Sequence, residues 1–437
     1  MKRKQISVFI AAMALTLSLT ACGASATSTS QTSGTSTAQT TESTVASTSV
    51  ESTTTQESTT AETTSSDDTT TAETTTSITA VEGSMLDTTS LFSDRDLEQT
   101  ADLTSATTIT VQDGEDVTIT EEGVYVITGD ASEVTITVEA ADTAKVQIVL
   151  DGVTITNTDA PAIYVKTADK VFVTTTDSDN SLSVTGSYTA DGDTNLDAVI
   201  FSKSDLTLNG TGTLTIVSAQ GNGITSKDDL ILTGGTYTIT SAADGLEAND
   251  FIGITGGTIT IDADGDAIHS ENEEDNTLGS IYIAGGTIDI TAGDDGIHAT
   301  TVLQIDAGTI NIQTSVEGME ATYIQINGGT IDVYATDDGI NATTKSTSYE
   351  VMIEVNGGDI SVEVGSGDTD AFDANGSIVI NGGTIDVTAN SGFDYDGAGE
   401  LNGGTVTLNG EVQTTLPSSM MGGGGAMDGT RPARGGM

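Results

Sequence analysis

The sequence Asp295-Gly296-Ile297-His298-Ala299 is one copy of a five-residue motif that decides the fold of this chain. Each copy places an acid first, then a small residue, a hydrophobic residue, a polar residue and another small residue. The copies begin at Asp244, Asp266, Asp295, Glu317, Asp338 and Asp370. Their spacings of 22, 29, 22, 21 and 32 residues give a short repeat with insertions, which is typical of a solenoid.

A Gly-Gly turn and two further strands complete each repeat. The motif Gly-Gly-Thr-Ile-x-Ile, with small variations, begins at Gly234, Gly256, Gly285, Gly328, Gly357, Gly382 and Gly403. Side chains alternate across a strand, so the hydrophobic residues stack inside while Thr, Asp and Asn face out. This pattern predicts an all-β parallel β-helix, a three-sheet solenoid of about ten coils over residues 146–410. A leucine-rich repeat would need its Leu/Asn signature and an antiparallel sandwich would need hairpin turns, and the sequence shows neither.

Two segments precede the strands. Residues 1–22 combine a basic start with an apolar run and end in Leu-Thr-Ala-Cys22, which resembles a bacterial lipobox. This pattern predicts a lipoprotein signal peptide, lipidation of Cys22 and a lipid-anchored protein on the extracellular face of the bacterial cell membrane. The alternative is an ordinary secretion signal with an incidental cysteine. Residues 23–84 are rich in Ser and Thr, and they hold too few apolar groups to offset their ordering entropy, so we expect a disordered linker.

The regions that flank the solenoid differ from its repeats. Residues 85–145 contain alternating strands without the acidic motif, which predicts an N-terminal β cap, because terminal repeats of solenoids are atypical. Residues 411–437 form a Gly/Met-rich tail to which we assign no function.

The charge of the chain excludes some classes of partner. Asp and Glu number 65 against 12 Lys and Arg, a formal net charge of −53. Such a surface repels nucleic acid and anionic lipids. We therefore expect no nucleic-acid partner and membrane contact through the lipid anchor alone. We also expect the chain to be a monomer.

The acids that head the motif stack into a column. Stacked coils lie about 4.8 Å apart, and like charges at that spacing repel by about 3–4 kcal/mol at an effective dielectric constant near 20. Either several acids stay protonated or cations lie between them, and Ca²⁺ suits oxygen ligands best. A second polar row follows three residues later, at Glu247, His269, His298, Glu320, Asn341 and Asp373. The alternative is that Asp favours the turn and caps backbone N–H groups.

Upstream, acidic and amide residues alternate from Asp191 to Asp197, like the front half of a calcium loop that lacks its terminal Glu. The predicted Ca²⁺ ligands lie in this loop, in the two rows or directly before the acid row. They are Asp191, Asp193, Asn195, Asp197, Asp244, Glu247, Asp264, Asp266, Asp294, Asp295, Glu317, Glu320, Asp337, Asp338, Asp370 and Asp373.

Both histidines of the chain, His269 and His298, occupy neighbouring coils of the second row, between Glu247 and Glu320. Imidazole suits Zn²⁺ or Mn²⁺, so the pair is a candidate transition-metal site. The alternative is two exposed histidines at a position that tolerates any polar residue.

Toward the N-terminus, lysines and aromatic residues replace the acids. Lys166, Lys203 and Lys227 align with one another, and Tyr164 and Phe201 lie beside them. Such residues can pair with uronate carboxylates and stack on sugar faces. Alternatively, the lysines neutralise the nearby acids Asp205, Asp228 and Asp229. Further along, we predict two outward aromatic residues as sugar contacts, Tyr282 and Tyr334.

Four stretches carry a family resemblance: Phe92–Leu97, Glu122–Gly129, Val146–Ile155 and Ala190–Lys203. Together with the Asp-Gly-Ile-His/Asn-Ala repeats, they resemble the carbohydrate-binding, calcium-containing β-helix family of cellulolytic clostridia over roughly residues 91–410. The resemblance implies a right-handed parallel β-helix similar to polysaccharide lyases. It also implies several bound Ca²⁺ ions and binding of cellulose-like or pectic polysaccharide.

Three functions remain open from the sequence. The first is a cell-surface lipoprotein that binds polysaccharide through a Ca²⁺-loaded β-helix. The second is a polysaccharide lyase that acts on uronate polymers, for which Lys203, Lys227 and Lys345 are the candidate bases. The third is a non-catalytic adhesin or structural protein, which the absence of Trp favours.

Overall fold

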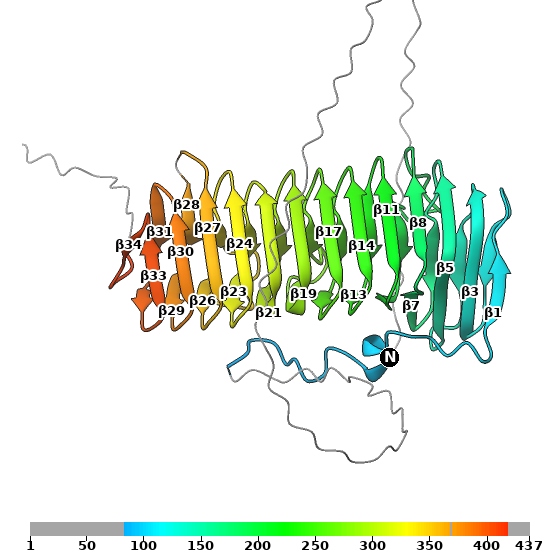
Figure 1. Ribbon diagram of the computed structural model, residues 1–437, viewed down its shortest axis with the longest axis horizontal. Coiled ribbons are helices and arrows are strands. Elements are labelled where there is room, and N and C mark those ends of the chain that lie inside the picture. The colour runs from blue at the N-terminus through cyan, green and yellow to red at the C-terminus, as the bar shows by residue number, and fades with distance from the viewer. Residues whose placement is uncertain (1–82, 368, 418–437) are drawn as a thin grey trace, which may run out of the picture. The chain divides into compact units, whose positions relative to one another are not determined.

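The computed structural model describes residues 83–367 and 369–417 (Figure 1). Cys22, the predicted signal peptide at residues 1–22, the predicted linker up to residue 82 and the predicted tail from residue 418 lie outside these ranges. None of the helices in the described ranges has the length and apolar character needed to cross a membrane.

Twelve parallel strands form one sheet, which we call sheet C, and they come from successive coils. They are β2 (Val117–Ile119), β4 (Ile136–Glu139), β6 (Ile163–Thr167), β9 (Ala198–Ser202), β12 (Asn222–Ser226), β15 (Leu246–Ala248), β18 (Ile268–Ser270), β20 (Ile297–Ala299), β22 (Met319–Ala321), β25 (Ile340–Ala342), β28 (Asp370–Ala374) and β31 (Ser391–Tyr395). The acidic motif therefore forms the sheet C strands of the coils in which it occurs.

A 22-stranded sheet holds the other strands of each coil in two parallel ladders. The first ladder contains β1 (Thr107–Thr110), β7 (Lys170–Thr175), β10 (Asp205–Gly210), β13 (Asp229–Leu232), β16 (Phe251–Ile254), β23 (Tyr323–Ile326), β26 (Met352–Val355), β29 (Ser377–Ile380) and β32 (Gly399–Leu401). The second contains β8 (Asp179–Val184), β11 (Thr213–Ser218), β14 (Thr236–Ser241), β17 (Thr258–Ala263), β24 (Thr330–Ala335), β27 (Asp359–Val364), β30 (Thr384–Thr388) and β33 (Thr405–Leu408). A short last strand, β34 (Glu411–Val412), pairs antiparallel with β33.

Four long strands run through both ladders: β3 (Gly123–Ser132), β5 (Lys145–Asn157), β19 (Ser280–Ala292) and β21 (Val302–Thr314). They join two of the three predicted sheets into one, because hydrogen bonding continues along these strands through the turn region. In most other coils the Gly-Gly turn separates the two ladders. Gly257, for example, has φ +95°, and a Cβ on Gly256 would lie 2.7 Å from the carbonyl oxygen of Thr233. The prediction of an all-β parallel solenoid is confirmed.

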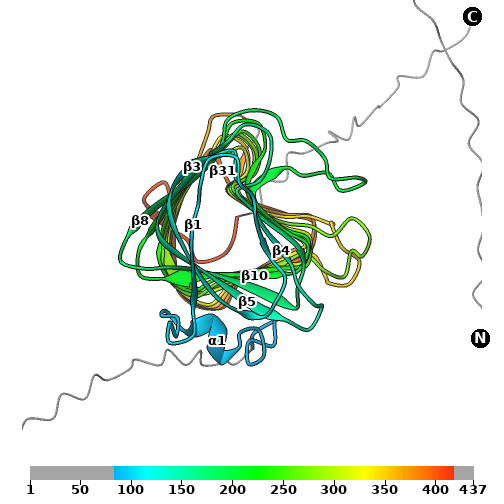
Figure 2. The ribbon, with the colours of Figure 1, turned by 90° about the vertical axis from the view of Figure 1, so that its right-hand side faces the viewer.

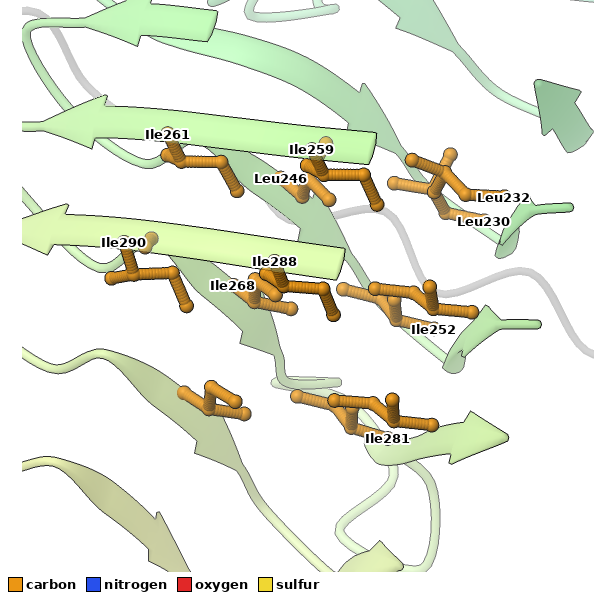
Figure 3. Close-up of a cluster of buried hydrophobic side chains, with 14 of the residues drawn as sticks. Leu230, Leu232, Leu246, Ile252, Ile259, Ile261, Ile268, Ile281, Ile288 and Ile290 are labelled. Carbon is orange, nitrogen blue, oxygen red and sulfur yellow. The ribbon is translucent and has the colours of Figure 1, made fainter. Parts of the chain in front are cut away.

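The inward side chains stack along the solenoid in rows (Figure 3). Ile259 and Ile261 of β17 lie over Ile288 and Ile290 of β19, and all four are at most 1% exposed. Burial of one such side chain stabilises a fold by about 1.5–3 kcal/mol. The core therefore follows directly from the period-2 pattern of each strand.

The strands before residue 145 belong to the same ladders as the later ones. β1 pairs with β3, β3 pairs with β5, and β2 pairs with β4, all in parallel register. The separate N-terminal β cap that we predict for residues 85–145 is therefore not confirmed. Of the twelve sheet C strands, ten remain within residues 146–410 once β2 and β4 are set aside. This number agrees with the prediction of about ten coils.

Residues 83–103, which we call the N-terminal strap, lie outside the solenoid along the outer face of the first ladder (Figures 1 and 2). The strap contains α1 (Asp94–Leu97), whose first turn is closed by a capping box from Ser93. The backbone N–H of Leu86 donates to Gln304 Oε1 over 2.9 Å, and Lys170 Nζ lies 2.8 Å from Asp96 Oδ1. The strap therefore spans several coils.

Candidate functional site

The polar row of the acidic motif is continuous across sheet C. Glu247 pairs in register with His269, His269 with His298, and His298 with Glu320. Asn341 and then Asp373 continue the row toward the C-terminus. The predicted alignment of these residues is confirmed by the strand register.

The acids that head the motif are joined by hydrogen bonds from coil to coil. Asp244 Oδ1 accepts the backbone N–H of Asp266 over 2.9 Å, and Asp266 Oδ1 accepts that of Asp295 over 2.9 Å. Asp338 Oδ1 does the same for Asp370 over 2.8 Å. One oxygen of each of these acids thus caps a backbone N–H group, which is the alternative to a purely metal-binding role for the acids.

The second oxygen of these acids faces the polar row of the next coil. His269 Nδ1 lies 3.0 Å from Asp244 Oδ2, and His298 Nδ1 lies 3.2 Å from Asp266 Oδ2. The two imidazole rings stack with centroids 4.7 Å apart and planes inclined by 15°. The two rows therefore interlock at the histidines, because His269 and His298 each lie between acids of two coils.

The histidines change the electrostatics of the acid column. Burial by itself would lower the pKa of His269, but Asp244 and Asp266 outweigh it and raise that pKa to about 9. Burial would raise the pKa of Asp266, but His298 and His269 outweigh it and the pKa is lowered. At His269 the chain therefore supplies positive charge of its own, which relieves the repulsion between Asp244 and Asp266.

From Asp295 toward the C-terminus, carboxylates also face other carboxylates. Burial and then the charges of Asp266 and Glu320 raise the pKa of Asp295 to about 7. Burial, Glu320 and Asp295 raise that of Glu317 to about 8. Burial, Asp338 and Asp370 raise that of Asp373 to about 7. These coils favour protonation or a bound cation, as expected from the column of acids.

A basic side chain enters this region from a loop. Lys345 follows β25 and its Nζ lies 2.5 Å from Glu320 Oε2. It neutralises one of the facing carboxylates. Lys345, a candidate catalytic base for a lyase, is thus already engaged in an ion pair.

A cleft of about 680 Å³ lies against sheet C beside the insertion that follows β18. Its lining includes Asp197, Lys227, Glu247, His269 and Glu271. Lys227 Nζ lies 2.9 Å from Glu247 Oε1, while Glu247 Oε2 accepts a hydrogen bond from Thr225 Oγ1 over 2.9 Å. Figure 2 shows the loops that extend outward beyond β4 at this side of the solenoid.

Asp197 contributes an unsatisfied group to the cleft. Its Oδ1 atom is buried without a hydrogen-bond partner. Burial, followed by the charge of Glu247, raises its pKa to about 6. The cleft thus combines a carboxyl group of raised pKa with a fixed carboxylate and an ammonium group.

The loop 186–197 does not form the predicted calcium loop as a unit. Asp191 Oδ2 pairs with Lys166 Nζ over 2.8 Å, Asp193 and Asn195 are exposed, and Asp197 lies in the cleft. The loop folds back onto sheet C, and Leu196 packs there in a buried cluster. Its oxygen atoms therefore point to different surroundings.

Three predicted sugar-stacking residues are covered. The loop around Leu196 buries Tyr164 and Phe201, which are 5% and 0% exposed. The strap buries Tyr282, which is 1% exposed and lies 6.1 Å from Phe92 between ring centroids. The direction of these side chains is as predicted, but other segments cover them, so their assignment as sugar contacts is wrong for this structure.

The remaining predicted residues stay accessible. Tyr334 of β24 is 38% exposed. Lys203 is exposed, and Lys227 lines the cleft. The three acids before the acid row are exposed: Asp264, Asp294 and Asp337. Of these, Asp294 has a carboxylate oxygen within 4.8 Å of those of Asp266 and Asp295.

One acidic cluster is not among the predicted sites. Oxygens of Asp205, Asp228 and Asp229 lie within 4.8 Å of one another, where sheet C meets the first ladder. Burial and then Asp205 raise the pKa of Asp229 to about 7. The sequence does indicate this cluster. Lys203 aligns with Lys227, so the acids two positions later, Asp205 and Asp229, align as well.

Comparisons with known proteins agree on one family description. A family model for a carbohydrate-binding domain-containing protein matches residues 113–371 and 316–418. A protein of Acetivibrio thermocellus with the same description is 37% identical over 127 residues, which are 28% of this chain and 44% of that protein. This chain thus spans less than half the length of that relative.

One solved structure is also similar, a polysaccharide lyase-like protein from C. thermocellum in its gadolinium derivative. It shares 31% identity at a TM-score of 0.44, over 51% of this chain and 92% of its own.

Proposed function

This chain belongs to the family of carbohydrate-binding domain-containing proteins, and from that premise we propose that it binds an extracellular polysaccharide along sheet C. The observation that carries the proposal is the cleft at Lys227 and Glu247, which opens beside a continuous row of polar side chains. A row that repeats with the coils suits a polymer whose units also repeat.

The groups in the cleft suit sugar hydroxyls. Carboxylates accept hydrogen bonds and an ammonium group donates them. Glu247 is held by Thr225 and Lys227, so it is already oriented before a sugar arrives. Lys227 also offers positive charge to a uronate carboxylate. Both cellulose-like and pectic glycans are thus candidates.

The proposal includes Ca²⁺ at the coils where acids face acids. The residues that would hold it are Glu317, Asp338, Asp370 and Asp373. Their fit rests on the donor set, which consists of carboxylate oxygens, and on the raised pKa of Asp373, whose carboxyl lies among the charges of Asp338 and Asp370. A bound Ca²⁺ would neutralise these acids and bridge to the carboxylates of a uronate polymer.

We further propose the finer assignments that the sequence supports. The coils wind in a right-handed sense, as in the β-helix family that this sequence resembles. Cys22 carries the lipid, so the chain is a monomeric lipoprotein on the extracellular face of a bacterial membrane. Mass spectrometry of the mature N-terminus tests the lipid, and an unmodified Cys22 would contradict it.

Replacement of one lysine tests the binding face. Lys227→Met removes the ammonium group from the cleft, and we expect polygalacturonate to bind at least tenfold more weakly by titration calorimetry, which corresponds to about 1.4 kcal/mol. Lys203→Met is the matched control, because Lys203 occupies the same register position one coil earlier, is exposed and does not line the cleft. Equal affinities of the two variants would contradict the assignment of the cleft.

A lyase remains a second candidate because Lys227, one of the candidate bases, lies in the cleft. Its Nζ is paired with Glu247 over 2.9 Å, which favours a binding role over proton abstraction. Ultraviolet absorbance of unsaturated products distinguishes the two functions. Formation of such products by the wild type, abolished in Lys227→Met, would establish the enzyme instead.

A further inference from the structure

We infer that His269 and His298, together with the acids beside them, form a binding site for a divalent transition metal of the Zn²⁺ class. The site consists of Asp244, Asp266 and Asp295 with the two imidazoles, and it is distinct from the proposed Ca²⁺ positions. It depends on neither the polysaccharide nor the proposed function.

Each imidazole faces two carboxylates through the same nitrogen atom. His269 Nδ1 lies 3.0 Å from Asp244 Oδ2 and 3.6 Å from Asp266 Oδ2. His298 Nδ1 lies 3.2 Å from Asp266 Oδ2 and 3.7 Å from Asp295 Oδ2. Zinc bonds to nitrogen and oxygen are about 2.0–2.2 Å long in tetrahedral geometry, which places neighbouring ligand atoms roughly 3.3–3.6 Å apart. The observed separations of 3.0–3.7 Å span this range, so the atoms could converge on one ion after shifts of a few tenths of an ångström.

Asp266 links the two halves of the site. Its Oδ2 atom is within 4 Å of both Nδ1 atoms, and one atom from each of Asp266, His269 and His298 falls within a common distance of 4.8 Å. A carboxylate in this position can bridge two ions or complete the shell of one.

The acids are fixed before any metal arrives. The Oδ1 atoms of Asp244, Asp266 and Asp295 each accept a backbone N–H of the next coil, over 2.9, 2.9 and 3.3 Å. Each Oδ2 atom is thereby held toward the imidazoles. Ligands that are oriented in advance bind a metal at lower entropic cost.

The other ring nitrogen of each histidine faces a carboxylate oxygen. His269 Nε2 lies 3.4 Å from Glu271 Oε2, and His298 Nε2 lies 3.4 Å from Glu320 Oε2. Histidine ligands commonly direct their second N–H toward a carboxylate, which fixes the tautomer. His269 Nε2 is buried and has no hydrogen-bond partner among the described residues, so Glu271 faces it at 3.4 Å without a formed hydrogen bond.

The nitrogen ligands decide the class of metal. Ca²⁺ takes oxygen ligands, whereas imidazole and carboxylate together suit Zn²⁺ and its neighbours in the first transition series. The competing occupant of Nδ1 is a proton, which would make each imidazole a cation shared between two carboxylates. A metal and a proton cannot occupy the same nitrogen atom, so an experiment can separate the two.

The test is a Zn²⁺ titration of the metal-free full chain by calorimetry at pH 7, with millimolar Ca²⁺ present to occupy oxygen-only sites. We expect saturable binding that weakens at least tenfold in His269→Gln and in His298→Gln. Asp262→Asn is the matched control with unchanged affinity, because Asp262 is exposed on β17 in the second ladder.

Cobalt gives a second readout on the wild type that does not depend on folding of the variants. Co²⁺ in this site should show the intense visible absorption of four-coordinate cobalt, and Zn²⁺ should displace it. Absence of Zn²⁺ binding in Ca²⁺ buffer, or equal binding by wild type and the His269→Gln/His298→Gln double variant, would overturn the inference. Weak, six-coordinate cobalt spectra would overturn it as well.

Discussion

Gly253 shows how one missing side chain positions a distant segment. It lies in the outward row of the first ladder, between Ile231 and Tyr282 in register. A Cβ at this position would approach the ring of Phe92 to 2.8 Å and that of Phe251 to 2.7 Å. The ring of Phe92 thus occupies space that any other residue would fill.

Gly253→Ala should therefore loosen the strap without unfolding the coils. An overpacked contact of this kind costs about 1–3 kcal/mol, and the ring of Phe92 is the part that can move away. Hydrogen exchange should show lower protection for residues 84–97 and unchanged protection in β17 and β19. Gly367→Ala is the control, because its Cβ would meet only Thr369 at 3.5 Å. Unchanged protection of the strap in Gly253→Ala would refute the argument.

At the scale of elements, the strap is attached to the first ladder by a buried ion pair. The side chains of Asp96 and Lys170 are 1% and 11% exposed, and Thr207 donates a further hydrogen bond to Asp96 Oδ1 over 2.6 Å. The guanidinium carbon of Arg95 lies 4.3 Å from the ring centroid of Phe172. Removal of one partner from such a pair leaves the other charge buried without compensation.

Lys170→Met should consequently release the strap. Loss of one partner of a buried pair costs about 3–5 kcal/mol, and this cost falls on the docked strap, because the pair joins Asp96 of the strap to Lys170 of β7. Limited proteolysis should then cut within residues 84–97 much faster than in the wild type. Asp94→Asn is the control, because Asp94 lies on the same helix but is exposed. Equal cleavage rates for Lys170→Met and Asp94→Asn would contradict this role of the ion pair.

The same pair makes strap docking sensitive to acid. Burial by itself would raise the pKa of Asp96, but Lys170, Ser93 and Thr207 outweigh it, so the pKa is lowered. A carboxylate with a lowered folded-state pKa stabilises the docked state above its unfolded pKa of about 3.9. This stabilisation is lost as the pH falls through the folded-state value. The protection of the strap from hydrogen exchange should thus decrease when the pH is lowered below about 4. Asp96→Asn should abolish this decrease, and an identical pH profile in the variant would contradict the role of Asp96.

At the scale of the whole molecule, the repeat was predictable because its causes are local. Side-chain alternation fixes which residues point inward, and the repeat length fixes which coils stack, so the register of Glu247, His269 and His298 follows from the sequence. The sequence pattern does not predict which segments cover the outer surface of the solenoid. Tyr282 points outward as expected, yet Phe92 covers it from 190 positions earlier in the chain. No periodicity within a coil encodes such a contact.

The predictions about metal sites divide in the same way. The rows of acids were predictable from spacing, whereas the counter-charges were not, because they depend on which side chain faces each acid. His269 faces Asp244, but Asp373 lies among other acids. The column therefore divides into two regions, one in which imidazoles face the acids and one in which most acids face other acids.

Chelation should act most strongly on the second region. Each coil of a solenoid contacts mainly its neighbours, so local repulsion lowers the stability of the coils in which it occurs. A ligand at a hundredfold excess over its Kd stabilises the folded state by about 2.7 kcal/mol, and each kcal/mol shifts the Tm of a domain of more than about 300 residues by roughly 1–2 °C. Ca²⁺ should thus raise Tm by roughly 3–5 °C over EDTA for each site filled, and hydrogen exchange in EDTA should increase first in β25, β28 and β31.

Asp373→Asn removes one of the facing charges, so it should raise Tm in EDTA and reduce the difference between the two buffers. The matched control is Asp332→Asn, because Asp332 is exposed on β24 in the second ladder, outside the acid rows. It should keep the full difference. If the wild type melts at the same temperature in EDTA and in Ca²⁺, the acids of the C-terminal coils are held by protons, and the proposed Ca²⁺ sites do not exist.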